Sequence, residues 1–133
     1  MSFNEVFLHL VMPIDAKNKL PHPITMKLVE TKLSKTVSEF GGETLAVKLL
    51  PNHVHILVSV LPAASIDDLV VELKGETSEL VEGTGRGETL VWAEGYGVVS
   101  VSKSHIDIVK NYIDTQEERH KTGKLNATLE KSA

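Results

Sequence analysis

The residues best suited to chemistry in this sequence are two histidines one residue apart, His53 and His55. Successive side chains of a β-strand point to opposite faces, so both imidazoles lie on one face if this segment is a strand. Imidazole nitrogens bind divalent transition metals, and they bind Mg²⁺ when oxygen ligands complete the shell. A pair of hydrogen-bonded histidines in a half-buried strand is the alternative, and it is the commoner outcome for an isolated pair.

A second candidate group, Tyr112 and Gln116, lies further along the sequence. From Ser104, a candidate N-cap, to about His120, apolar residues recur at helical spacing. Residues four apart are neighbours on one helix face, so the Gln116 amide oxygen could be a third metal ligand beside the phenol. The alternative is an ordinary amphipathic helix, with Tyr112 in the core and Gln116 facing solvent.

The elements that must position these residues follow from the hydrophobic pattern. We expect strands at about 5–12, 43–50, 53–60 and 96–102, and helices at about 25–40 and 65–81 before the tyrosine helix. The order β-α-β-β-α-β then helix predicts an α+β fold. It is a ferredoxin-like, RNA-recognition-motif-like antiparallel sheet with helices on one face, plus a C-terminal helix carrying the tyrosine. The other face of the sheet is expected to be free for a ligand.

This order of segments resembles the single-tyrosine HUH transposases, which include the insertion-sequence 200/605-like transposases and the REP-associated tyrosine transposases. The resemblance covers roughly residues 3–121. Its segments are His9 in the first strand, Leu-Pro-Asn-His-Val-His at 50–55, Leu-Lys-Gly at 73–75, Trp-Ala-Glu-Gly-Tyr at 92–96 and Tyr-Ile-Asp-Thr-Gln at 112–116. The histidine pair alone is unspecific, but all five segments in this order are a strong signature.

The resemblance implies a DNA transposase that cuts and rejoins single-stranded DNA near hairpins by metal-assisted transesterification. His53, His55 and Gln116 would bind Mg²⁺ or Mn²⁺, and Tyr112 would attack phosphorus to give a 5′-phosphotyrosine intermediate. A phenol has a pKa near ~10, so a nearby cation or base is needed at neutral pH. The resemblance also implies a homodimer in which the tyrosine helix of one subunit can complete the metal site of the other.

Nucleic-acid contacts are expected from Lys17, Lys19 and Lys27, and from Trp92 and Tyr96 stacking on unpaired bases. The net charge of -4 does not favour a broad basic face. Residues 65–94 carry eight acidic side chains against one lysine and one arginine, so a DNA-binding face should lie elsewhere. The lysines can equally be a solvated surface, and the two aromatics can equally be buried in the core. His9 and His120 can approach the metal, with a core position and an exposed helix end as their alternatives.

Composition sets the domain organisation. With 133 residues, 41% of them hydrophobic, and no cysteine, the chain suits one domain without disulfides. We expect a single transposase-like catalytic domain at 1–121 and a flexible C-terminal tail at 122–133. No apolar run approaches the ~18 residues of a membrane span, and we expect a cytoplasmic protein that is nucleoid-associated when acting on DNA.

Two other functions fit the same residues. A diverged non-catalytic single-stranded nucleic-acid-binding protein would keep the sheet and aromatics, and replacing Tyr112 by Phe would leave its binding unchanged. A metal-dependent phosphodiesterase would use His53 and His55 to activate water and would form no covalent adduct with DNA.

Overall fold

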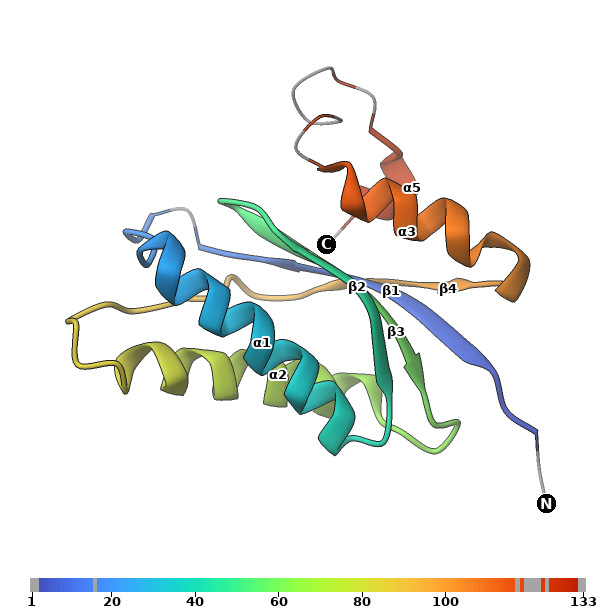
Figure 1. The fold of residues 1–133 in the computed structure, drawn as a ribbon, viewed down its shortest axis with the longest axis horizontal. Coiled ribbons are helices and arrows are strands. Elements are labelled where there is room, and N and C mark those ends of the chain that lie inside the picture. Colours follow the sequence, from blue (N-terminus) through green and yellow to red (C-terminus); the bar gives the residue numbers. More distant parts are fainter. Residues whose placement is uncertain (1–2, 16, 117, 119–122, 124, 132–133) are drawn as a thin grey trace.

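Four strands form a single antiparallel sheet at the centre of the computed structural model, which describes residues 3–15, 17–116, 118, 123 and 125–131 (Figure 1). The strands are β1 (Val6–Pro13), β2 (Glu43–Leu49), β3 (His53–Val60) and β4 (Gly97–Val101). Their order across the sheet is β2-β3-β1-β4, with every neighbouring pair antiparallel. This is the strand order of the ferredoxin-like split β-α-β unit, and the predicted fold class is confirmed.

Two long helices, α1 (Pro23–Glu39) and α2 (Ile66–Glu82), cover one face of the sheet (Figure 1). Pro23 suits the first turn of α1, and the Ser65 hydroxyl caps α2 by accepting the backbone N–H of Asp68 at 3.2 Å. Asp67 and Asp68 lie in the first turn of α2, where acidic side chains favour the helix dipole. No helix in the described part of the chain is long and apolar enough to cross a membrane.

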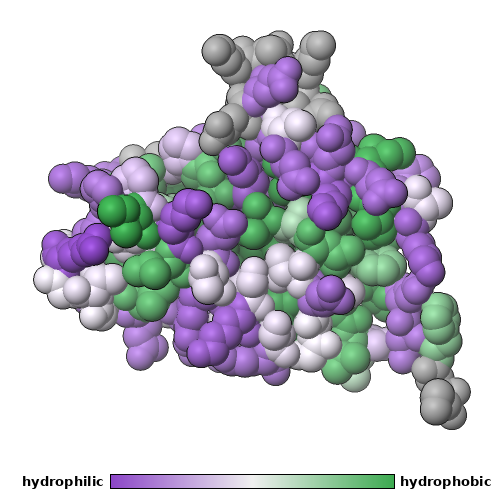
Figure 2. Space-filling view, in the orientation of Figure 1, coloured by the Kyte–Doolittle hydropathy of each residue, from purple (hydrophilic) through white to green (hydrophobic). Residues whose placement is uncertain are grey.

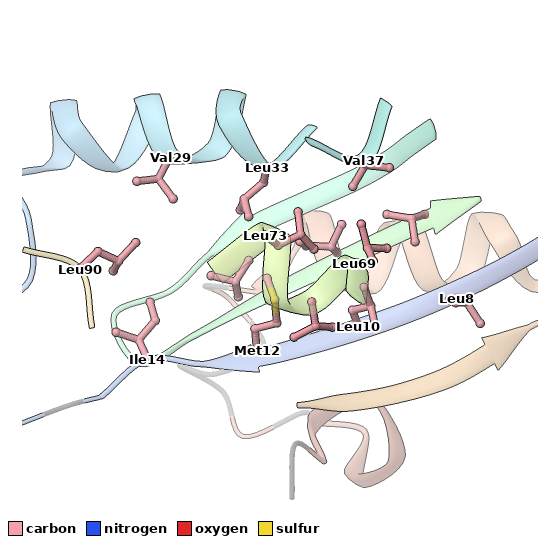
Figure 3. Close-up of a cluster of buried hydrophobic side chains, with 14 of the residues drawn as sticks. Leu8, Leu10, Met12, Ile14, Val29, Leu33, Val37, Leu69, Leu73 and Leu90 are labelled. Atoms are coloured by element: carbon pink, nitrogen blue, oxygen red, sulfur yellow. The ribbon is translucent and has the colours of Figure 1, made fainter. Parts of the chain in front are cut away.

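The main core lies between this face and the two helices (Figure 3). Alternate residues of β1 and β3 point into it, as the two-residue period of a strand requires. Its buried side chains include Leu8, Leu10 and Met12 of β1, Val54, Ile56 and Val58 of β3, Val29, Leu33 and Val37 of α1, and Leu69 and Leu73 of α2. Each large apolar side chain buried in this way stabilises the fold by roughly 1.5–3 kcal/mol. The remaining residues of β1 and β3, including both histidines, therefore point to the opposite face.

The opposite face is partly covered by α3 (Ile106–Asp114), which follows a 3₁₀ turn, η1 (Lys103–His105), and by the short helix α5 (Ala127–Glu130). The apolar stripe of α3 packs Val109 and Ile113 against Ala46, Leu57 and Val101. The expectation that this face is free for a ligand was therefore wrong along α3. The stripe that identifies the helix needs an apolar surface to bury it, and only this face remained.

The tyrosine helix begins at Ile106 and is interrupted at Thr115, inside the range 104–120 that the pattern predicts. Regular α3 ends at Asp114, and Thr115 has non-helical dihedral angles. The Thr115 hydroxyl donates to the backbone carbonyl of Asn111 at 2.7 Å. Side-chain bonds of this kind compete with helix continuation and bend the chain. Gln116 and Glu118 are helical again, whereas 117 and 119–122 lie outside the described residues.

Two glycines provide a matched test of this fold. A Cβ added at Gly42, between α1 and β2, would lie 2.4 Å from the backbone carbonyl oxygen of Ser59. We expect Gly42→Ala to destabilise the protein by about 1–3 kcal/mol, since the backbone must shift. Gly75, inside α2, has nothing within 4 Å of such an atom, and Gly75→Ala should stabilise by about 0.5–1 kcal/mol. Urea unfolding followed by circular dichroism measures both, and equal effects would contradict this packing.

Candidate metal and tyrosine site

His53 and His55 come together on the face of β3 that is turned toward α3. Their Nε2 atoms lie 3.0 Å apart. His55 is fully buried, whereas the His53 side chain keeps 12% of its surface exposed. Val54, between them, points into the core on the other side of the sheet. Strand geometry thus places two imidazole nitrogens side by side at the edge of a buried region.

A carboxylate that the sequence analysis did not identify completes this group. Glu130 Oε1, at the end of α5, lies 3.2 Å from His53 Nε2 and 3.1 Å from His55 Nε2. Adjacent ligands of an octahedral ion with bonds near 2.1 Å are about 3.0 Å apart. The two imidazoles and the carboxylate therefore have the spacing of three adjacent positions around one divalent ion.

The protonation of the group also fits a cation. The His53 Nδ1–H donates to Asn52 Oδ1 at 2.5 Å, which leaves the lone pair on Nε2 facing the site. Burial lowers the pKa of His55 to about 4, partly opposed by the nearby Glu130 carboxylate, so its imidazole is neutral at pH 7. The neutral His55 imidazole, the His53 Nε2 and a carboxylate oxygen leave electron-rich atoms close together, and a divalent ion satisfies such a set.

His9, on the neighbouring strand β1, lies behind this group. His9 Nε2 and His55 Nδ1 are 3.0 Å apart, and the rings are stacked with centroids 5.1 Å apart. Burial lowers the pKa of His9 to about 4 as well, with Glu130 opposing the shift. His9 is therefore a neutral, hydrogen-bonded histidine that contacts a candidate ligand rather than one of the three grouped atoms. The two alternatives stated for His9, a buried position and a position near the site, are therefore both true.

Tyr112, on α3, places its hydroxyl against the same carboxylate. The hydroxyl donates to Glu130 Oε2 and accepts the backbone N–H of Asn126 at 2.9 Å. The ring meets His55 edge-on with centroids 6.1 Å apart. Burial, followed by the bond to Glu130, raises the pKa of the phenol, while the Asn126 N–H and the Gln116 side chain act in the opposite direction. The phenol is thus protonated at neutral pH and hydrogen-bonded to a potential proton acceptor.

Gln116 is fully buried, so the alternative that it faces solvent is wrong. Its Nε2 donates to the backbone carbonyl of Tyr112 at 3.0 Å. Its Oε1 is buried without a hydrogen-bond partner among the residues described, a situation that costs about 1–3 kcal/mol for a neutral group. Coordination to a metal ion or a hydrogen bond from a bound water would satisfy that oxygen. Gln116 as a metal ligand stays a prediction, while the carboxylate grouped with the histidines is Glu130.

The two aromatics predicted to stack on bases lie in the segment between α2 and β4. Trp92 Nε1 donates to the Thr77 hydroxyl at 3.0 Å, and the Tyr96 hydroxyl donates to Asp67. Both partners belong to α2, and both rings pack against the main core. Their surroundings match the core-packing alternative, and base stacking stays a prediction.

The predicted cationic residues Lys17, Lys19 and Lys27 are exposed. Lys19 lines a cleft of about 560 Å³ with His22 and Arg86 beside the start of α1, on the layer away from His53 and His55. Hydrophilic residues are spread over the face seen in Figure 2, interspersed with hydrophobic ones. No described contact joins these lysines to the histidine pair, and DNA binding by them stays a prediction. His120 lies outside the described residues.

Comparisons with known proteins agree with this architecture. The family described as "Transposase IS200 like" matches residues 2–116. ISDra2 transposase TnpA of Deinococcus radiodurans is 27% identical to this chain over 95 residues. The match covers 65% of this chain and 66% of TnpA, so this chain spans just under two thirds of the length of TnpA.

Two solved structures share the fold. A protein described as a transposase of Deinococcus radiodurans R1 superposes with a TM-score of 0.66 at 21% identity, over 86% of this chain and 93% of that one. A REP-associated tyrosine transposase bound to a REP hairpin gives a TM-score of 0.67 at 11% identity, over 90% of this chain and 72% of that one. At these identities the likeness concerns the fold alone. Because the family match covers most of the chain, including His53, His55, Tyr112 and Gln116, this chain belongs to the IS200-like transposase family.

Proposed function

We propose that this chain is a single-tyrosine HUH transposase that cuts and rejoins single-stranded DNA through a 5′-phosphotyrosine intermediate, with Mg²⁺ or Mn²⁺. One observation carries the proposal. The Tyr112 hydroxyl is hydrogen-bonded to a carboxylate whose other oxygen contacts both His53 and His55. A nucleophile, a proton acceptor and a candidate metal site therefore meet in one place.

The chain's own residues have distinct roles in this proposal. His53 and His55 would hold the ion with Glu130, or with Gln116 as the resemblance implies, and the bound ion would stabilise charge on the scissile phosphate. The Tyr112 oxygen attacks phosphorus while its proton passes to Glu130 Oε2. The bond from phosphorus to the 3′-oxygen breaks, and that oxygen leaves as a 3′-hydroxyl after taking a proton from water. A phosphodiester bond is lost and another is formed, so a second 3′-hydroxyl can reverse the step without ATP.

The substrate is proposed to be hairpin-containing single-stranded DNA. The support is the shared fold with a REP-associated tyrosine transposase whose structure holds a REP hairpin. Within this structure Tyr112 contacts His55 of its own chain. The homodimer, exchange of tyrosine helices between subunits, the catalytic-domain boundary at 121 and the nucleoid location remain proposals that rest on the resemblance.

Detection of the covalent intermediate tests the proposal. The protein is incubated with Mn²⁺ and hairpin-bearing oligonucleotides from the DNA that flanks its own gene, labelled at either the 5′ or the 3′ end. We expect a denaturing gel to show a protein adduct that carries the 3′ label only, because the tyrosine binds the 5′ end of the downstream fragment. EDTA should abolish it. Cleavage without an adduct would indicate the phosphodiesterase, and binding without cleavage would indicate the non-catalytic protein; either result contradicts the proposal.

A further inference from the structure

The contact between the buried side chains of His9 and His55 has no role in the chemistry described so far. The two residues come from adjacent central strands, β1 and β3, and their facing nitrogens are 3.0 Å apart. Both side chains are at most 1% exposed, and the strands are paired along their whole length. Close packing around both rings therefore opposes rotation of either side chain. The contact between the two facing nitrogens is therefore favoured by the packing of the fold.

The hydrogen bond to His9 can decide which of the two His55 ring nitrogens carries the proton, and therefore which one has a free lone pair. A neutral imidazole carries one proton, so a proton on Nδ1 leaves Nε2 free, and a proton on Nε2 leaves Nδ1 free. His55 Nε2 is the atom that faces His53 Nε2 and Glu130 Oε1. It can bind an ion only when the Nδ1–H donates to His9.

We propose that His9 is a positioning residue, which accepts the Nδ1–H of His55 and thereby holds the His55 Nε2 lone pair toward the divalent ion. The inference rests on the proposed function for the presence of that ion. A hydrogen bond to the distal nitrogen of a ligating histidine fixes its tautomer and ring orientation, and its loss typically lowers metal affinity about 10–100-fold. In most such pairs a carboxylate or a backbone carbonyl accepts this proton. Here a second neutral imidazole takes that place.

Metal binding measured on the whole chain by calorimetry with Mn²⁺ tests the role. His9→Phe fills the same space without a nitrogen, and we expect it to weaken Mn²⁺ binding about 10–100-fold. His9→Gln carries an amide oxygen that can accept the His55 proton, and we expect it to recover most of the affinity. His105→Phe replaces an exposed histidine of η1 and is the matched control, with unchanged affinity. Thermal unfolding of each variant separates loss of metal binding from loss of the fold.

A spectroscopic readout reports on the tautomer itself. In ¹⁵N NMR of the unaltered protein without metal, we expect His55 to carry its proton on Nδ1, and His9→Phe should lose this preference. Three results would overturn the proposal. They are wild-type affinity in a folded His9→Phe variant, a His55 proton that stays on Nε2 with the ion bound, and no Mn²⁺ binding by the unaltered chain. These readouts need no DNA. A missing covalent adduct with intact, His9-dependent metal binding would therefore refute the proposed function and leave this inference standing.

Discussion

Replacing Tyr112 by Phe is expected to abolish the covalent protein-DNA adduct and to reduce strand cleavage by on the order of 10³-fold or more, the scale seen when a catalytic nucleophile is removed. The ring is buried beside His55, and Phe keeps that packing. Only the hydroxyl is lost, with its bonds to Glu130 and to the backbone N–H of Asn126. The cost to folding should be about 1 kcal/mol, so the variant remains folded. Adduct formation on a denaturing gel and Mn²⁺ affinity by calorimetry are to be measured on the same preparation.

The sequence offers a matched control for this variant, because it contains a single other tyrosine, Tyr96. The Tyr96 hydroxyl also donates to a carboxylate, that of Asp67, but it lies against α2 and the main core. Tyr96→Phe should therefore keep the adduct. An adduct that survives in Tyr112→Phe, or that disappears in Tyr96→Phe, would mean that Tyr112 is not the nucleophile.

The second large effect concerns Glu130, the proposed third metal ligand. We expect Glu130→Gln to lower Mn²⁺ affinity at least about 10-fold, because a neutral amide replaces the carboxylate that meets both histidines at 3.1–3.2 Å. The same change weakens the acceptor for the Tyr112 proton, so adduct formation should fall even at saturating Mn²⁺. Glu72→Gln, at an exposed position of α2, removes the same charge and should change neither quantity.

Gln116→Leu provides the competing arm of this experiment. The Gln116 amide oxygen is buried without a partner among the described residues. Replacing the Gln116 side chain by an apolar one should therefore not destabilise the protein strongly. Unchanged Mn²⁺ affinity in Gln116→Leu beside a weakened Glu130→Gln would assign the third position to Glu130. The opposite pattern would assign it to Gln116 and would leave Glu130 with a role outside the coordination shell.

The parts of the site that could be predicted lie on regular elements. The shared face of His53 and His55 follows from the two-residue period of a strand, and the helical position of Tyr112 follows from the apolar stripe of Val109 and Ile113. The fold class could be predicted for the same reason, because each of its strands and helices has a clear hydrophobic period in the sequence. In each case the local pattern and the tertiary packing require the same conformation.

Glu130 could not be predicted because the segment that carries it has no such pattern. Helix α5 has four residues, and none of them is buried. The available signal was Asn126, whose side chain accepts the backbone N–H groups of Thr128 and Leu129 as a helix N-cap. A cap shows that a helix begins but not what it contacts. The interpretation of 122–133 as a tail therefore contained no hint that this segment reaches the histidines.

Trp92 illustrates a different limit of sequence reasoning. An indole suits a base-stacking surface and a core equally well, and its partner Thr77 precedes it by 15 residues on another element. Similarly, the irregularity of β2 between Thr44 and Ala46 depends on its pairing with β3. Such features are set by contacts between distant segments, and no local pattern encodes them.

The position of α5 has a thermodynamic consequence. None of the residues of α5 is fully buried, and the polar contacts at the site made by Glu130 and by the N-cap residue Asn126 help to place it. Glu130 lies 77 positions along the chain from His53, so an ion shared by the two would close a long loop. Ordering the C-terminal segment and binding the ion would then be linked equilibria: each is favoured by the other with the same free energy. The intrinsic affinity of the ligand set would exceed the observed one by the cost of ordering this segment.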